Sequence, residues 1–215
     1  MKLTKRLNEI VELAKGYKYA ADIGCDHGKA AYALLKNNYC EKIIISDISV
    51  KSLNKAERLL KDFIVSGKAA AVCCEGLLKI DKKIDLAVIA GMGGREIVTI
   101  LEEADFKPFA LVLQPMKDAD ILRGYLINNY KIIKDYTIFD KKFYDFIKAE
   151  TGNDDYTPLE SEFGRDNLKE KSTDFLLKIN KLIEKHEGYL KRENLSEKSR
   201  EDIGMQLNKL LQITN

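Results

Sequence analysis

Apolar and polar residues alternate along this chain in a rhythm of short apolar runs and longer amphipathic stretches. Four of the five apolar runs are followed by residues that repeat at helical spacing, which indicates strands alternating with helices. The run IDLAVIA is almost continuously apolar, as is typical of a parallel strand buried on both faces. The predicted strands occupy residues 19–23, 42–46, 69–74, 84–90 and 109–113. The predicted helices that follow them occupy residues 30–36, 49–63, 95–103 and 118–130. This alternation predicts an α/β fold built on a parallel sheet.

Two further elements flank this series. Apolar residues between Leu3 and Leu13 recur at helical spacing, so a helix is expected before the first strand, with Gly16 as its cap. Residues 131–139 and 143–149 are two β-rich runs separated by three polar residues, which predicts an antiparallel hairpin at the sheet edge. Five strand–helix units and this hairpin make a seven-stranded, Rossmann-like sheet.

The chain changes character after the predicted hairpin. The segment TGNDDYTP at residues 151–158 is polar and rich in turn-forming residues, so it indicates a boundary. We therefore expect one domain over residues 1–155 and a C-terminal helical pair over residues 156–215.

The pattern of the C-terminal segment predicts two helices. Apolar residues from Leu168 to Tyr189 are spaced by three, four and seven positions, a heptad-like stripe along one long helix. The stripe continues from Ile203 to Leu210 on a second helix. The predicted turn between the helices is marked by Gly188, Asn194 and Ser196. We expect an antiparallel, coiled-coil-like pair that packs on itself and against the domain, with His186 in a structural position on the stripe.

Charge and cysteine content argue against a strongly basic nucleic-acid-binding protein and against a secreted protein held by disulfides. The 215 residues carry 36 Lys and Arg against 34 Asp and Glu, a net charge of +2. Residues 1–150 hold 25 basic and 21 acidic side chains, so any basic surface for nucleic acid must be local. The four cysteines form no CxxC pair, and we expect no metal site. No leader-like segment and no run of about 18 apolar residues occurs, so a cytoplasmic protein without a membrane span is expected.

The loop after the first predicted strand carries the strongest chemical signal. Residues 22–28 read DIGCDHG, with Gly24 and Gly28 placed for a tight turn and close approach of the backbone to a ligand. Asp26 stands where a dinucleotide-binding loop would have its middle glycine. A carboxylate there would repel a pyrophosphate but favour a ligand with positive charge. S-adenosylmethionine carries a sulfonium and an amino group and no phosphate, so this loop favours a methyl donor over NAD.

Residues at the other predicted strand ends complete a donor site. Asp47 lies 19 residues after Gly28, the distance at which an acidic residue binds ribose hydroxyls in Rossmann-like sites. Its alternative role is that of a charge at a helix N-terminus. Glu75 follows the third predicted strand, where it either binds the edge of the donor's adenine or lies in a solvated turn. The glycines of Gly91–Gly94 would expose backbone N–H and C=O groups to a flat ligand.

The predicted site residues fall into two groups. The cofactor-binding residues are Asp22, Gly24, Asp26, Gly28, Asp47, Ile48, Glu75, Gly76, Ala90, Gly91, Met92 and Gly93. The substrate-binding residues are Gly94, Gln114, Pro115, Lys29 and Arg95, with Lys117 and Arg123 as further phosphate contacts. For each of these cations, a solvated helix surface is the alternative.

Three motifs stand out in the chain: DIGCDH at residues 22–27, IAGMGG at residues 89–94 and LQP at residues 113–115. Together they resemble the TrmK family of bacterial tRNA (adenine-N1)-methyltransferases, which modify position 22. The resemblance spans nearly the whole chain and implies the class I methyltransferase sheet, S-adenosylmethionine as donor and tRNA as acceptor. Family members commonly continue the first motif with an aromatic residue and Leu-Pro, whereas this chain has Gly28-Lys29-Ala30-Ala31. The aromatic wall for the target adenine is therefore missing, and Tyr32 is either its substitute or a core residue.

The reaction implied by the resemblance makes modest demands on the protein. Adenine N1 has a free lone pair and no proton to lose, so alignment and compensation of the cation formed on the ring matter most. We assign catalytic roles to Asp26, for charge compensation, and to His27, for orienting the base or the donor.

Two other functions remain open on the sequence alone. One is a Rossmann-like methyltransferase for a small molecule or a protein. The other is a non-catalytic RNA-binding protein with this fold. The oligomeric state is expected to be a monomer or a weak dimer.

Overall fold

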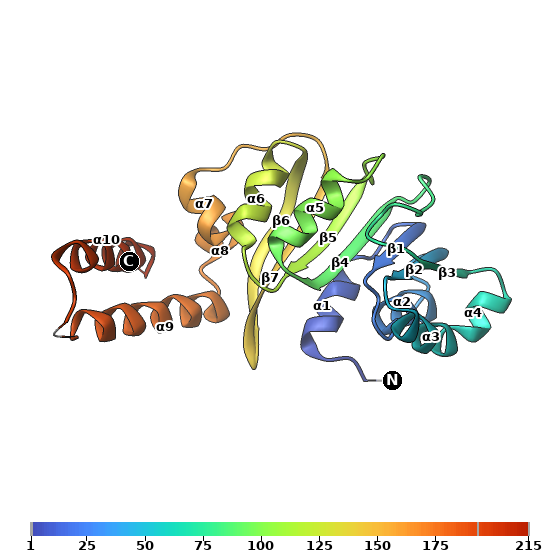
Figure 1. Ribbon diagram of the computed structural model, residues 1–215, viewed down its shortest axis with the longest axis horizontal. Helices are drawn as coiled ribbons and strands as arrows, with labels where there is room; N and C mark the ends of the chain where they lie inside the picture. Colours follow the sequence, from blue (N-terminus) through green and yellow to red (C-terminus); the bar gives the residue numbers. More distant parts are fainter. Residues whose placement is uncertain (1, 193, 215) are drawn as a thin grey trace.

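The computed structural model describes residues 2–192 and 194–214, and a seven-stranded sheet forms its centre (Figure 1). The strands lie in the order β3-β2-β1-β4-β5-β7-β6. β1 to β5 pair in parallel, and β7 runs antiparallel to both β5 and β6. The strands are β1 Tyr19–Ile23, β2 Lys42–Asp47, β3 Ala69–Cys73, β4 Leu86–Met92, β5 Ala110–Pro115, β6 Tyr130–Asp140 and β7 Lys142–Thr151. The predicted α/β fold, its seven strands and its edge hairpin are confirmed.

Helices cover both faces of the sheet. One face packs against α1 Lys5–Leu13, α2 Lys29–Lys36 and α3 Val50–Leu59, with the short α4 Lys61–Val65 beyond them. The other face packs against α5 Gly94–Glu102 and α6 Ala119–Ile127. Residues 86–89 of β4 are fully buried between these layers, as the uninterrupted apolar run predicts.

The predicted helix over residues 49–63 is two helices in the structure. Ser49 caps the first of them, because its hydroxyl accepts a hydrogen bond from the backbone N–H of Ser52 at 3.3 Å. The helical backbone is interrupted at Leu60, which lies between α3 and α4 and is completely buried. A continuous apolar stripe therefore did not guarantee a continuous helix.

The C-terminal segment differs from its predicted pattern in two respects. Two helices, α8 Arg165–Glu170 and α9 Thr173–Leu190, stand in place of one long helix from Leu168, and the short α7 Pro158–Phe163 precedes them. The break occurs because Lys171 adopts a left-handed conformation (φ 45°) and Ser172 caps the next helix. Gly188 lies inside α9, so its assignment to the turn was also wrong.

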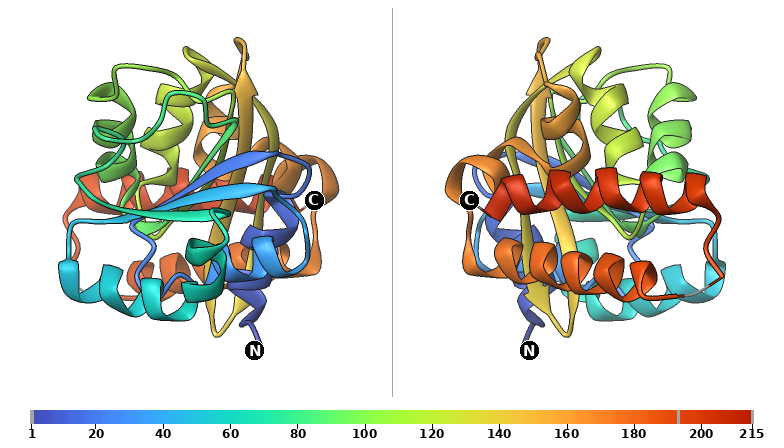
Figure 2. Two further views of the ribbon diagram at one scale, coloured as in Figure 1. Left: turned by 90° about the vertical axis from the view of Figure 1, so that its right-hand side faces the viewer. Right: turned by 90° about the vertical axis from the view of Figure 1, so that its left-hand side faces the viewer.

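The last two helices form the expected antiparallel pair. α10 Glu197–Thr214 returns alongside α9, and the pair extends away from the sheet at the β6 edge (Figures 1 and 2). A small separate core holds it, made of Phe163, Phe175, Ile179, Leu210 and Ile213. The division of the chain into two domains at residue 155 stays a prediction.

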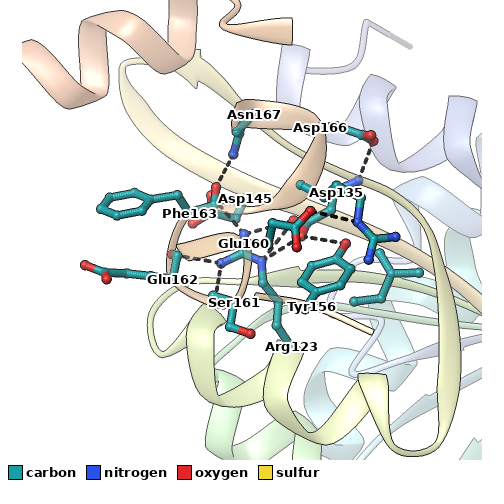
Figure 3. Close-up of polar contacts among 12 residues, drawn as sticks. Arg123, Asp135, Asp145, Tyr156, Glu160, Ser161, Glu162, Phe163, Asp166 and Asn167 are labelled. Carbon is teal, nitrogen blue, oxygen red and sulfur yellow. Dashed lines mark hydrogen bonds and ion pairs between the residues drawn. The ribbon is translucent and has the colours of Figure 1, made fainter. Parts of the chain in front are cut away.

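A buried polar network joins the sheet to the helices that follow it (Figure 3). Arg123 of α6 is 1% exposed and donates from Nε and Nη2 to the carboxylate of Asp135, at 2.8 to 3.0 Å. Its Nη1 donates to the carbonyl oxygens of Ser161 and Glu162 at the end of α7. Arg123 is therefore no phosphate contact: the expectation of a surface position was wrong, because its charge is neutralised inside the protein.

A second carboxylate extends this network to α9. Asp145 of β7 accepts hydrogen bonds from Lys178 at 2.9 and 3.1 Å and from Thr137 at 2.6 Å. Burial opposes ionisation of Asp145, but Lys178 and Arg123 hold its pKa below the ordinary value. This ion pair between Lys178 and Asp145 thus links α9 to β7.

Candidate active site

A cleft of about 560 Å³ opens at the carboxyl ends of the central parallel strands. This size lies within the range of small-molecule sites, about 300–1,000 Å³. Its lining residues are Arg6, Ile23, Gly24, Asp26, Asp47, Ile48, Cys74, Glu75, Gly76, Ala90, Gly91, Met92, Glu96, Thr99, Ile100 and Glu103. Parallel sheets of this kind bind ligands at this edge, because the strand order reverses there and leaves a crevice.

The glycine loop after β1 is held closely against its neighbours. Gly24 has φ +66°, and a Cβ at this position would lie 2.2 Å from the terminal carbon of Met92. Asp26 also adopts a left-handed conformation (φ 48°), which aspartate tolerates better than most residues. The backbone N–H of Cys25 donates to the carbonyl of Ser46 at 2.9 Å. The loop therefore presents its backbone and the Asp26 carboxylate to the cleft in a fixed conformation.

Asp47 at the end of β2 secures this loop and faces the cleft. Its Oδ2 accepts a hydrogen bond from the backbone N–H of Asp26 at 3.1 Å, and its Oδ1 accepts one from the backbone N–H of Ser49 at 2.8 Å. Each carboxylate oxygen has further lone pairs, so both can still accept from a ligand hydroxyl. The structure thus brings Asp47 to the expected place and adds a structural role there.

The two predicted catalytic residues form a pair at the cleft mouth. His27 Nδ1 lies 2.7 Å from Asp26 Oδ1, and the two side chains are 45% and 72% exposed. Asp26 lines the cleft, whereas His27 lies outside its lining. The imidazole is positioned to orient the carboxylate, and both remain open to an approaching ligand.

Asp22 lies beneath the loop and does not line the cleft. Burial raises its pKa to about 7, and the nearby Asp47 adds to this shift, while a hydrogen bond from the backbone of Ala31 opposes it. Asp22 therefore lies behind the loop, and its predicted role in cofactor binding stays a prediction.

The end of β4 contributes Ala90, Gly91 and Met92 to the cleft, whereas no residue of β5 is among its described lining residues. Gly94 packs against the next loop so closely that a Cβ would lie 2.1 Å from the carbonyl oxygen of Asp118. Gln114 and Pro115, predicted to contact substrate, have buried side chains. Lys29, Arg95 and Lys117 are exposed, as a phosphate contact requires. The substrate roles of these residues stay predictions.

Several cleft residues were not predicted from the sequence. Glu96, Thr99 and Ile100 come from one face of α5, and Glu103 is the residue that caps this helix. Their spacing of three and four residues after the glycines is the signal that could have located them. Ile23 and Cys74 adjoin predicted positions. Arg6 comes from α1, far from every motif, and no local pattern marked it.

The lining chemistry fits S-adenosylmethionine better than a nucleotide phosphate. Five carboxylates line the cleft, from Asp26, Asp47, Glu75, Glu96 and Glu103, against a single cation among the lining residues described. This surplus of negative charge suits a sulfonium and an amino group and repels a pyrophosphate. Within residues 2–192 and 194–214, no cluster of three or more His, Cys, Asp or Glu side chains is arranged to hold a metal ion.

Comparison with known proteins agrees with this chemistry. A family model described as a methyltransferase domain matches residues 3–147. The tRNA (adenine(22)-N(1))-methyltransferase of Bacillus subtilis is 30% identical over 161 residues, which cover 72% of this chain and 68% of that protein. A putative tRNA methyltransferase of Mycoplasma genitalium is 29% identical over 149 residues, covering 66% of both chains. The matched part thus spans about two thirds of these relatives.

A solved structure extends the similarity to the C-terminal helices. The structure of M. capricolum TrmK in complex with S-adenosylhomocysteine has a TM-score of 0.87 and 25% sequence identity. The alignment covers 99% of this chain and 97% of that one. In the part of this chain that the structure describes, no helix is both long and apolar enough to cross a membrane.

Proposed function

Because the chain belongs to the TrmK family of methyltransferases, we propose that it transfers a methyl group from S-adenosylmethionine to N1 of adenine 22 in tRNA. The observation that carries this proposal is the acid-lined cleft behind a glycine loop, which suits a cationic donor. The named relatives supply the acceptor, since a tRNA adenine is the substrate in the name of the Bacillus subtilis protein.

The residues of the cleft have distinct tasks in holding the donor. S-adenosylmethionine supplies, when bound, an electrophilic methyl group on its sulfonium. Asp47 accepts hydrogen bonds from the ribose hydroxyls, and Glu75 faces the adenine edge from the end of β3. The bulge between Ala90 and Met92 leaves backbone groups of this stretch unpaired with β5 and open to the cleft. The loop holds these groups in position before the ligand binds, which favours alignment of the donor's methyl group with the acceptor nitrogen.

Asp26 and His27 act on the acceptor base. Methylation at N1 leaves a positive charge on the adenine ring, and a carboxylate near the ring stabilises that charge more in the transition state than in the ground state. Asp26 at the cleft mouth is suited to this task, and His27 holds its carboxylate at 2.7 Å. No general base is required, because N1 carries no proton.

The target adenine must leave its stack to reach the cleft. N1 lies on the Watson–Crick edge, so the base enters unpaired or extruded. Tyr32 packs edge-to-face against Phe63 with ring centroids 5.8 Å apart, which supports a core role over a stacking role. Met116 is 47% exposed directly after β5, so an apolar side chain borders the acceptor side. We assign the contact with the extruded base to this methionine.

The remaining properties follow from the proposed substrate. Folded RNA is recognised mainly by shape and phosphate contacts, so the exposed Lys29, Arg95 and Lys117 face the RNA around the cleft. We also propose that the protein acts in the cytoplasm as a monomer or a weak dimer. Measuring the mass of the purified protein in solution by light scattering distinguishes the monomer from the dimer.

The proposal is tested by methyl transfer to unmodified tRNA. After incubation with S-adenosylmethionine, mass spectrometry of the tRNA nucleosides should detect 1-methyladenosine. Calorimetric binding of the donor without any tRNA methylation would favour a small-molecule or protein acceptor. Failure to bind the donor at all would favour a non-catalytic RNA-binding protein.

A further inference from the structure

The charge of the cleft opposes the approach of an RNA backbone. Among its described lining residues, five carry carboxylates and one carries a positive charge. A phosphate next to the target base is repelled by such a lining, because like charges repel strongly near a protein surface. Binding of RNA at this cleft therefore requires positive charge on the surface beside it. The hairpin of β6 and β7 carries such charge at its tip.

This hairpin extends past the rest of the sheet on the side where the cleft opens. β5 pairs with β7 as far as Leu113 and Ile147, whereas β6 and β7 continue for five more residue pairs, to Asp140 and Lys142. At about 3.3 Å per residue, the tip lies roughly 17 Å beyond the last residue pair of β5 and β7. β5 and β6 run in the same direction, so this tip projects at the edge where the parallel strands end (Figure 1).

The tip is braced from two sides, by α1 and by α9. Lys5 of α1 donates to the carbonyl oxygen of Phe139 at 3.0 Å and pairs with Asp174 of α9 at 3.0 Å. Asp174 also accepts a hydrogen bond from the backbone N–H of Phe139 at 2.9 Å. The backbone N–H of Arg6, a residue of the cleft lining, donates to Asp140 at 3.2 Å. These contacts fix the hairpin tip beside the cleft.

Basic side chains dominate the surface of the tip. Lys141 and Lys142 are exposed, and neither forms an ion pair within 4.0 Å in the part of the chain that the structure describes. Lys181 of α9 is exposed as well, and its ammonium lies 5.2 and 5.4 Å from the centroids of the two phenylalanine rings of the tip. The carboxylates of Asp140 and Asp174 accept hydrogen bonds from backbone N–H groups. The lysines therefore keep their charge available for a partner.

We infer that the tip of the β6–β7 hairpin binds phosphates of the RNA strand that carries the target adenine; this inference rests on the proposed function, that the protein methylates a tRNA adenine. Lys141 and Lys142 make the contacts, and Lys181 continues the same surface onto α9. An ammonium binds phosphate as a point charge and reads no base sequence. The hairpin tip thus positions the RNA, while the cleft receives the base.

The inference is tested with a double variant that preserves the turn. Lys141 has a left-handed conformation (φ 63°), which asparagine tolerates, so Lys141→Asn with Lys142→Gln removes both charges without straining the hairpin. Filter binding should show a loss of tRNA affinity of roughly three- to thirtyfold at low salt. The slope of log affinity against log salt concentration should fall by about one unit or less for each lysine. Donor affinity, measured by calorimetry, should stay unchanged, which also shows that the variant is folded.

Lys82→Gln with Lys83→Gln is the matched control. These two adjacent, exposed lysines lie in the turn before β4, at the opposite edge of the sheet, and their replacement should not reduce tRNA affinity. An equal loss in the control would overturn the role of the hairpin tip, because only net charge would then matter. Wild-type affinity and slope in the hairpin variant would overturn it too.

The salt series separates a phosphate contact from a change in conformation. The loss in the hairpin variant should shrink as the salt concentration rises, because salt screens exposed charges. A loss of the same size at every salt concentration would contradict the phosphate contact. If the wild type neither binds nor methylates tRNA, the proposed function fails. If the wild type methylates tRNA and only the hairpin variant behaves otherwise than expected, the inference alone fails, so the two failures are distinguishable.

Discussion

At the scale of single residues, the donor site depends on carboxylates with more than one contact. Asp47 fixes the loop through the backbone of Asp26 and also faces the cleft. Asp26 in turn pairs with His27. Because these groups are linked, a substitution at one position alters the conformation of the next. Conservative substitutions that keep shape and remove charge are therefore the informative ones.

Asp26→Asn should slow methyl transfer while leaving tRNA affinity nearly unchanged. The charge of Asp26 stabilises the cation that forms on the adenine, an interaction absent from the ground state. A loss on the order of tenfold, about 1.4 kcal/mol, is expected because the carboxylate is largely exposed. The measurement is the single-turnover rate at saturating donor and tRNA. A rate equal to that of wild type would limit Asp26 to donor binding or to loop structure.

Asp22 makes stability depend on pH in an identifiable range. Its pKa is about 7 in the folded protein and 3.8 as the ordinary value, so the folded state holds a proton that the unfolded state loses. Below about pH 4 both states are protonated and no penalty arises. Between about pH 4 and pH 7 the unfolded state loses this proton while the folded state keeps it, so stability falls progressively, by about 4 kcal/mol in total, and changes no further above that range.

Asp22→Asn removes this titration, so its stability relative to wild type should increase between pH 4 and pH 8. Urea unfolding of both proteins at several pH values measures the difference. An equal gain or loss at every pH would show that the Asp22 carboxylate is not buried in an unfavourable environment. Asp81→Asn, at an exposed position outside the cleft, is the control and should show no such trend.

At the scale of elements, apolar runs predicted the sheet well. β1 to β5 are recognisable because strands buried on both faces need apolar residues at nearly every position. The hairpin is recognisable from two β-rich runs and a polar turn. Helix limits were less predictable: the stripe from Leu168 continues across Lys171, although Ser172 carries a helix-capping signal in the sequence.

The site residues that lie at the ends of strands were predictable from the sequence. The loop at residues 22–28 and the ends of β2, β3 and β4 converge because parallel strands end at one edge of the sheet. Arg6 was not predictable, since α1 reaches the cleft only through tertiary packing. Arg123 was misassigned for a related reason: its partner Asp135 lies on another element, and a local pattern does not show pairing between elements.

Arg123→Met should destabilise the protein strongly. The substitution leaves Asp135 buried without its partner, and breaking a buried ion pair in this way costs about 3–5 kcal/mol. The free energy of unfolding in urea is the quantity to measure. Lys209→Met is the control, because its pair with Glu162 is partly exposed and should contribute at most about 1 kcal/mol. Equal, small losses for both variants would contradict the account of the network.

At the scale of the whole molecule, three lysines line a second hollow. A groove of about 520 Å³ between α1 and α2 is lined by Lys2, Lys5 and Lys36 together with Tyr32. No acidic side chain is among its described lining residues. The groove shares no described lining residue with the cleft, and it uses the C-terminal half of α2. Its positive charge suits phosphates of the bound RNA.

Replacing Lys2 and Lys36 together by Gln should raise the KM for tRNA several-fold and leave donor affinity unchanged. Removing an interaction with a phosphate should also reduce the salt dependence of RNA binding, by about one unit of slope or less for each lysine. Filter binding at several salt concentrations measures both effects. Lys51→Gln with Lys55→Gln on exposed positions of α3 is the control. An identical effect in the control would mean that only net charge matters.

The central claim is that this protein methylates N1 of one adenine in folded tRNA. The most direct measurement uses S-adenosylmethionine with a deuterated methyl group, an unmodified tRNA transcript and mass spectrometry of its nuclease fragments. The account predicts one labelled methyl group per tRNA, on the adenine at position 22, and none when that adenine is replaced by guanine. Label on another nucleotide, or on neither transcript while the donor binds normally, would contradict it.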